Sequence, residues 1–249
     1  GMWILNGLIL LRTGGKTIPA NQPTFSIIAQ GYLPKTVGWI IAAIVVAALV
    51  YAMISGRERK KRYGFVLAPF YQDLLKTVLF SAMVVVFIYM VNQYNGLPIP
   101  VLLLMITAVI MAYISNNTRF GRYSYAIGGN REAARLSGVN IRRTMFIIFL
   151  VMGVLAGISG VVLASYVGYG TIAAGQGYEL DAIAACILGG TSTLGGEGTV
   201  FGAMIGALIM ASLTNGLQIL NYPAALQYVI KGIVLVLAVY LDVSLKRRR

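Results

Sequence analysis

Few side chains in this sequence have the chemistry needed for catalysis. The 249 residues contain 7 acids, 1 cysteine and no histidine, so most hydrolytic triads, zinc sites and imidazole proton relays lack a central residue. Glu179, Asp181 and Glu197 would form an acid/base pair only if the fold brought two of them close to a substrate. We therefore expect no catalytic residue and no metal site. Asp181 is expected to offset a helix dipole, or else to contact a substrate or a partner protein.

The segment 181–198 is rich in glycine and reads DAIAACILGGTSTLGGEG. Gly190 and Gly195 have the spacing of a phosphate-binding loop, but Gly196-Glu197 follows where that loop carries its lysine, which argues against nucleotide binding. The apolar run after Asp181 is too short to span a bilayer, so we expect a short or broken helix. Non-helical backbone at membrane depth is tolerated only against protein or a water-filled cavity. This segment is therefore a candidate lining for a path across the membrane.

Composition indicates that the elements holding these residues are membrane helices. The chain is 58% hydrophobic and 11% charged, with a mean hydropathy of +0.80, whereas a water-soluble domain carries about 25% charged residues. The net charge of +13 sits largely in short loops between apolar runs. The positive-inside rule explains this pattern better than nucleic-acid binding, which would need a basic face interleaved with aromatic rings. We expect an all-α polytopic membrane helical bundle with the lipid bilayer, and no nucleic acid, as partner.

Hydropathy predicts about seven spans and one partial span in a single transmembrane domain, 1–249. The apolar run 2–11 is about half a crossing, so we expect the chain to begin inside a span. Basic clusters place 57–62, 116–143 and the C-terminus in the cytoplasm, and this parity requires 181–198 to cross, although as a broken helix. Two surface helices are expected at 25–32 and 68–76. The predicted spans are 37–55, 77–94, 101–115, 144–165, 181–198, 200–220 and 227–243.

Two glycine patterns predict close helix packing. Gly153, Gly157 and Gly160 recur at helical spacing in one apolar run, and Gly202-x3-Gly206 lies in another. Small residues at such spacing let a second helix approach closely. We expect both faces to be packing surfaces.

A polar, basic stretch at 125–144 separates two apolar runs. Arg131 and Arg135 share a helical face there, and Glu132 and Arg135 form an i,i+3 pair. The stretch therefore predicts a short amphipathic helix that ends at Ser137-Gly138. Composition alone would make it an ordinary cytoplasmic loop. The residues of interest are Arg131, Glu132, Ala133, Ala134, Arg135 and Gly138.

The pattern EAA-x3-G at 132–138 resembles the coupling loop of ATP-binding-cassette importer permeases. The longer string AIGGNREAARLSG, 126–138, is similar to the version in ribose, xylose and galactose permeases. The string from Gly177 to Leu220 also resembles those permeases, particularly the xylose type. The resemblance covers about residue 25 to the C-terminus. One departure is that the I-x-LP often found after the EAA stretch is absent, because 147–151 reads IIFLV.

The resemblance implies the permease subunit of an ATP-driven monosaccharide importer in the bacterial inner membrane. Such a subunit has about ten spans, forms a homodimer or a pseudo-dimer and is not itself an enzyme. ATP is bound by separate cytoplasmic ATPase subunits, so no cofactor is expected here, and an extracytoplasmic binding protein delivers the sugar. On this comparison, roughly the first two and a half spans are missing from the chain.

The resemblance also implies roles for particular residues. The six residues of interest at 131–138 would dock into the ATPase as part of a cytoplasmic coupling loop, 116–143. Glu179 and Asp181 would lie near the binding protein or the entrance to the path. Hydroxyl and amide groups would line the path, although bonding to carbonyls of their own helices is at least as plausible for Ser and Thr. These candidates are Thr191, Ser192, Thr193 and Asn215.

Two alternatives remain open from the sequence. A related permease for branched-chain amino acids or nucleosides would share the loop pattern. A secondary transporter without an ATPase would require acids or histidines inside the membrane, and the predicted spans carry very few of them.

Overall fold

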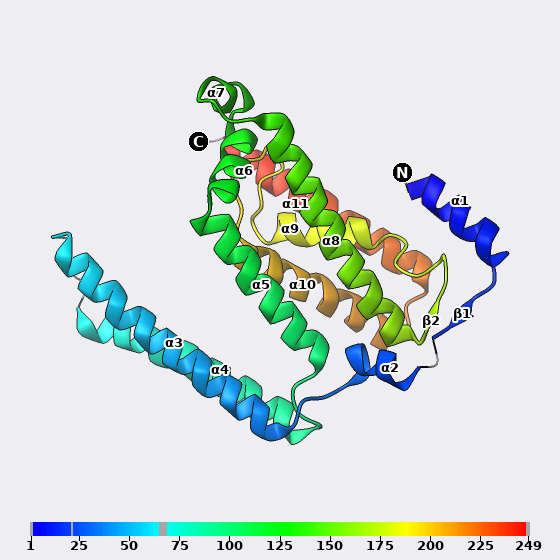
Figure 1. Ribbon diagram of the computed structural model, residues 1–249, viewed down its shortest axis with the longest axis horizontal. Coiled ribbons are helices and arrows are strands. Elements are labelled where there is room, and N and C mark those ends of the chain that lie inside the picture. The colour runs from blue at the N-terminus through cyan, green and yellow to red at the C-terminus, as the bar shows by residue number, and fades with distance from the viewer. Residues whose placement is uncertain (1, 21, 65–68, 248–249) are drawn as a thin grey trace. The chain divides into compact units, whose positions relative to one another are not determined.

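The computed structural model describes residues 2–20, 22–64 and 69–247, and helices account for most of them (Figure 1). The chain divides into two compact units, which are described separately. Unit 1 comprises Gly1–Ile18, Leu104–Ala164 and Gly170–Arg249, and unit 2 comprises Pro19–Leu103 and Ser165–Tyr169. The elements are α1 (Met2–Thr13), β1 (Ile18–Pro19), α2 (Pro23–Gln30), α3 (Lys35–Arg62), α4 (Phe70–Gln93), α5 (Ile99–Asn117), α6 (Arg119–Gly129), α7 (Arg131–Leu136), α8 (Ile141–Val167), β2 (Tyr169–Gly170), α9 (Tyr178–Leu188), α10 (Val200–Ile219) and α11 (Ala224–Arg247).

Among the described residues, six helices are long and apolar enough to cross a membrane, namely α3, α4, α5, α8, α10 and α11. At most 17% of the apolar window of any of them is buried inside the protein, as expected for helices whose solvent is lipid. The predicted fold class, an all-α polytopic membrane bundle, is confirmed. The part of the chain that the structure describes thus has six full spans and not about seven, because α9 has 11 residues and reaches only about 16 Å, half of the hydrocarbon core. The prediction of a broken helix at 181–198 is confirmed, since α9 ends at Leu188 and the backbone is non-helical up to Val200.

Two predicted boundaries are wrong. Helix α3 does not end at residue 55 but continues through the basic cluster to Arg62, because Arg and Lys favour helix once the chain has left the lipid. Of the surface helix expected at 68–76, residue 68 lies outside the described residues, and residues 70–76 are the first part of α4, which runs unbroken from Phe70 to Gln93. The other expected surface helix is present as α2.

Unit 2 contains the hairpin of α3 and α4, which lie side by side in Figure 1. Ala42 and Ile88 form its buried contact with Leu97. At the other end of the hairpin, Arg57 forms an ion pair with Asp73 and lies 5.2 Å from the centre of the Phe70 ring. One apolar cluster and one charged cluster therefore fix the register of the two helices.

Unit 1 contains the packed helices α9, α10 and α11. Gly206 faces the carbonyl oxygen of Ala185, and Gly202 faces that of Gly189, so closely that a Cβ at either glycine would overlap with it. The Gly202-x3-Gly206 prediction is thus confirmed, with α9 as the partner. By contrast, no described part of the chain comes within 4 Å of a Cβ placed at Gly153, Gly157 or Gly160, so that face of α8 has no packing partner among the described residues.

We predict that Gly206→Ala lowers the stability of unit 1 by about 1–3 kcal/mol, the usual cost of overpacking. Gly216→Ala, on the same helix, is the matched control, because nothing lies within 4 Å of its added Cβ. Thermal unfolding in detergent measures both variants. Equal melting temperatures for the two variants would contradict the packing assigned to Gly206.

Candidate functional site

Between α5 and α8 the chain forms two short helices, α6 and α7, which meet at Asn130. Thr118 caps α6 by accepting a hydrogen bond from Gly121 N at 3.3 Å. Asn130 ends α6 and caps α7, since its Oδ1 accepts from Ala133 N at 2.9 Å. Helix α7 ends at Ser137, and Gly138 follows with a φ of +82°, a conformation that favours glycine. The predicted helix and its end are both confirmed.

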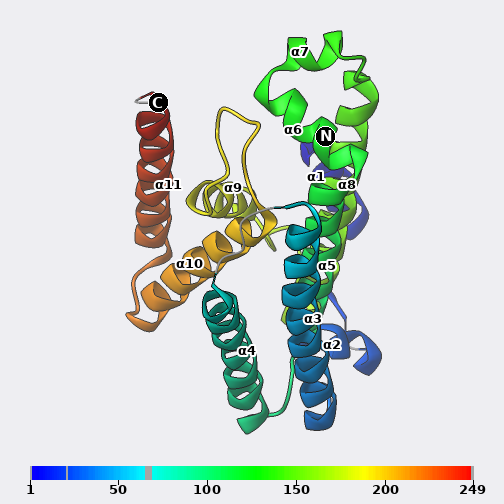
Figure 2. The same ribbon diagram turned by 90° about the vertical axis from the view of Figure 1, so that its left-hand side faces the viewer.

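The outer surface of α7 is charged and exposed. Arg135 Nη2 donates to Glu132 Oε1 at 2.6 Å, and 67% and 62% of their side chains are exposed, so this pair contributes little to stability. Ala134 is buried, whereas Ala133 is exposed. A shallow hollow beside the helix is lined by Arg131, Glu132, Arg135, Ile141, Arg142 and Met145. In Figure 2, α7 lies at the turn that joins α6 to α8, so it presents this mainly basic surface outward.

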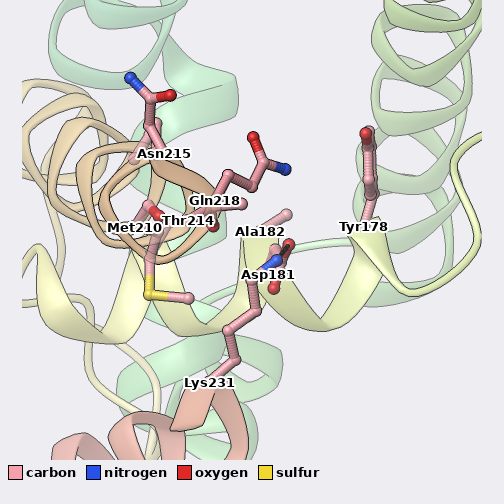
Figure 3. A pocket seen from close by; sticks show the side chains of 11 residues that line it. Tyr178, Asp181, Ala182, Met210, Thr214, Asn215, Gln218 and Lys231 are labelled. Carbon is pink, nitrogen blue, oxygen red and sulfur yellow. Dashed lines mark hydrogen bonds and ion pairs between the residues drawn. The ribbon is translucent and has the colours of Figure 1, made fainter. Parts of the chain in front are cut away.

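A second candidate site is a pocket of about 390 Å³ between α9, α10 and α11, which we call the polar pocket (Figure 3). Lys231 Nζ donates to Asp181 Oδ2 at 2.6 Å, and their side chains are 15% and 29% exposed. Charges in such apolar surroundings are costly unless they are paired. Helix α10 contributes hydroxyl and amide groups across the pocket from this ion pair. The polar lining residues are Tyr178, Asp181, Thr214, Asn215, Gln218 and Lys231.

Of the predicted path residues, the structure brings only Asp181 and Asn215 together, in the polar pocket. Asp181 also lies in the first turn of α9, which fits its predicted place at a helix N-terminus. Glu179, in the same turn, is exposed and does not line the polar pocket.

The other predicted path residues lie in the non-helical stretch after α9. Thr191 and Ser192 line a separate, largely apolar cavity of about 760 Å³ that involves α5, α6, α8 and this stretch. Thr193 is bound to Asp242 of α11, which accepts from Thr193 N at 2.9 Å and from Oγ1 at 2.8 Å. The predicted set is therefore divided between different places in unit 1.

Sequence reasoning missed Lys231, Thr214 and Gln218 as pocket residues. A usable signal existed for Lys231, since it is the one charged residue in the apolar run 227–241, and a lone charge in a span predicts a partner of opposite sign. Thr214 and Gln218 gave no such signal, because a polar residue in a helix does not reveal which way it faces. Within the described residues, no three Cys, Asp or Glu side chains gather as metal ligands would.

Comparison with known proteins assigns the chain to a family. The model of the family described as branched-chain amino acid transport system / permease component matches residues 4–239. The xylose transport system permease protein of Haemophilus influenzae is 42% identical over 248 residues, covering 100% of this chain and 66% of that protein. Its Escherichia coli counterpart is also 42% identical, and the chain covers 63% of it.

A ribose relative extends the comparison. The ribose import permease protein of Escherichia coli is 44% identical over 147 residues, which is 59% of this chain and 46% of that protein. No solved structure matches the chain. This chain thus spans somewhat less than two-thirds of the xylose relatives that it matches. With a family match across nearly all of its residues and six helices able to cross a membrane, the chain is a multi-pass membrane protein that belongs to the family of branched-chain amino acid transport system permease components.

Proposed function

We propose that this chain forms the translocation path in the permease subunit of an ATP-driven monosaccharide importer, with xylose or a similar sugar as substrate. The observation that carries the proposal is the 42% identity to xylose permeases over the whole chain. The ribose relative supports the same substrate class. The subunit itself is not an enzyme, and ATP is bound and hydrolysed by partner ATPase subunits.

The proposal includes where the chain lies and what it binds. The basic ends of α3, α7 and α11 favour the cytoplasmic side by the positive-inside rule, so the C-terminus lies in the cytoplasm of a bacterium and the protein in its inner membrane. The exposed charges of α7 dock into an ATPase subunit. A second permease copy completes the path, and an extracytoplasmic binding protein delivers the sugar.

The polar pocket has the chemistry of a monosaccharide path. A sugar offers hydroxyl groups that both donate and accept hydrogen bonds, and the pocket supplies a carboxylate, an ammonium group, two amides and two hydroxyls. Its volume of about 390 Å³ lies at the small end of the range for small-molecule sites. We propose that Asp181 and Asn215 contact the sugar here, together with Gln218 and Lys231.

A second candidate substrate is a branched-chain amino acid, which the description of the family model favours. Uptake of labelled substrates decides between the two. Reconstituted proteoliposomes would be given labelled xylose and, separately, labelled leucine, and uptake of leucine without uptake of xylose would contradict a sugar substrate.

We predict that Glu132→Arg uncouples ATP hydrolysis from the permease. The change removes the ion pair to Arg135 and puts a third positive charge on α7 where a carboxylate stood. A basic group of the ATPase that pairs with Glu132 would then face a like charge, which costs several kcal/mol, so stimulated hydrolysis should fall about tenfold or more. The measurement is ATPase activity of the reconstituted importer with sugar-loaded binding protein. Glu58→Arg is the matched control, because Glu58 is also an exposed acid in a basic segment. Unchanged hydrolysis in Glu132→Arg would rule out the docking role.

We further predict that Asp181→Ala lowers both stability and sugar uptake. Removing one partner leaves Lys231 unpaired in an apolar setting, which should cost about 1–3 kcal/mol for this partly exposed pair. Exchanging the two residues, Asp181→Lys with Lys231→Asp, should restore most of the melting temperature. The control is Glu179→Ala, an exposed acid of the same helix turn, and an Asp181→Ala variant that melts like this control would contradict the role of the pair.

A further inference from the structure

Residues 189–199, which we call the glycine loop, connect α9 directly to α10. The loop is folded on itself, since Ser192 N donates to Glu197 O at 3.0 Å. Gly195 and Gly196 have φ values of +92° and +77°, which glycine adopts far more readily than other residues. The loop therefore has a defined conformation that depends on its glycines.

One side of the glycine loop rests on the end of α6, as both Figure 1 and Figure 2 show. A Cβ placed on Gly128 would lie 2.5 Å from Gly196 N, and one placed on Gly195 would lie 2.6 Å from Gly128 O. Backbone thus touches backbone at this point, with no side chain between them to absorb a displacement. Gly128 precedes α7, the helix with the docking charges, by only a few residues.

A hydrogen bond ties the end of the same loop to α6. Tyr125 Oη donates to Gly198 O at 2.8 Å and lies 2.9 Å from Ser115 Oγ of α5. Tyr125 and Gly128 lie about one helical turn apart, so a single face of α6 makes both contacts. On another side the loop is held by Asp242 of α11, through Thr193 N and Oγ1.

The glycine loop also leads to the polar pocket. The pocket is lined from α9, α10 and α11, and no residue of α6, α7 or α8 contributes to it. Helix α9 ends where the loop begins and α10 begins where the loop ends, and the two helices are packed backbone to backbone at Gly202 and Gly206. A shift of the loop therefore moves the two helices that carry Asp181 and Asn215.

We propose that Tyr125 and Gly128 are positioning residues through which displacement of α7 reaches the polar pocket, with the glycine loop as the transmitting element. The inference rests on the proposed function, because it requires an ATPase that moves α7. In this account, α6 pushes on the loop through the Gly128 contact and pulls on it through the Tyr125 hydrogen bond. The two contacts together allow the loop to follow α6 in both directions.

The test uses Cys186, the single cysteine of the sequence, which is half-buried on α9 between Asp181 and the glycine loop. The importer is reconstituted with its ATPase subunits, and the rate at which N-ethylmaleimide alkylates Cys186 is measured by mass spectrometry without nucleotide and with ATP and vanadate. We expect the two rates to differ about fivefold or more in the wild type, a typical size for coupling between sites. Sugar uptake is measured on the same preparations.

Two variants and one control distinguish transmission from a merely structural role. Tyr125→Phe removes the hydroxyl and keeps the ring, and Gly128→Ala places a methyl group against Gly196. Gly129→Ala is the control, because nothing lies within 4 Å of its added Cβ. We expect Tyr125→Phe and Gly128→Ala to retain bound ATPase subunits but to lose the nucleotide dependence of the Cys186 rate, while Gly129→Ala keeps it.

The outcomes separate this inference from the proposed function. If Tyr125→Phe and Gly128→Ala respond to nucleotide as strongly as Gly129→Ala, the inference is overturned. Wild-type vesicles that take up sugar but show no change at Cys186 would overturn the inference alone. Wild-type vesicles that take up no sugar would overturn the proposed function, and the inference with it.

Discussion

The requirement that every backbone polar group find a partner where water is scarce governs this structure. Helices meet it within themselves, which is why nearly every apolar run is helical. The glycine loop cannot meet it in that way, and its partners come partly from the loop itself and partly from distant parts of the chain. Ser192 N donates a hydrogen bond to Glu197 O, and Thr193 N donates one to the carboxylate of Asp242. Gly198 O accepts one from the hydroxyl of Tyr125. The side chains of Tyr125 and Asp242, which bond to the backbone of the glycine loop, thereby connect α6 and α11 to this loop.

Glycine has two roles in the glycine loop and in the helix that follows it. At Gly195 and Gly196 it supplies left-handed backbone, whereas at Gly202 and Gly206 it permits contact between backbones. Helices α9 and α10 are consequently in close backbone contact, and the ion pair between Asp181 and Lys231 connects α11 to α9. In the proposed importer, such a closely packed group of helices is suited to carrying a movement of α7 to the polar pocket.

The features predicted correctly from sequence are those that depend on neighbours along the chain. Hydropathy located the six long spans but also counted 181–198 as a crossing, and the Glu132–Arg135 spacing with Gly138 located α7 and its end. The pairs Asp181–Lys231 and Tyr125–Gly198 were not predicted, because they depend on which helices meet and which way each side chain faces. For the same reason, the hydroxyl and amide residues predicted to line one path were divided between separate places: Asn215 lines the polar pocket, Thr191 the apolar cavity, and Thr193 binds Asp242.

The length of α3 has a consequence for how the protein sits in lipid. Its 28 residues extend about 42 Å, roughly 12 Å beyond the hydrocarbon core, and the surplus carries Arg59, Lys60, Lys61 and Arg62. A shift of the hairpin along the membrane normal away from this basic end would draw the four cations into hydrocarbon, and the ion pair of Arg57 with Asp73 makes α4 move with α3. The position of the hairpin along the membrane normal is therefore fixed. A bilayer of different thickness is accommodated by tilting the hairpin or by deforming the lipid around it.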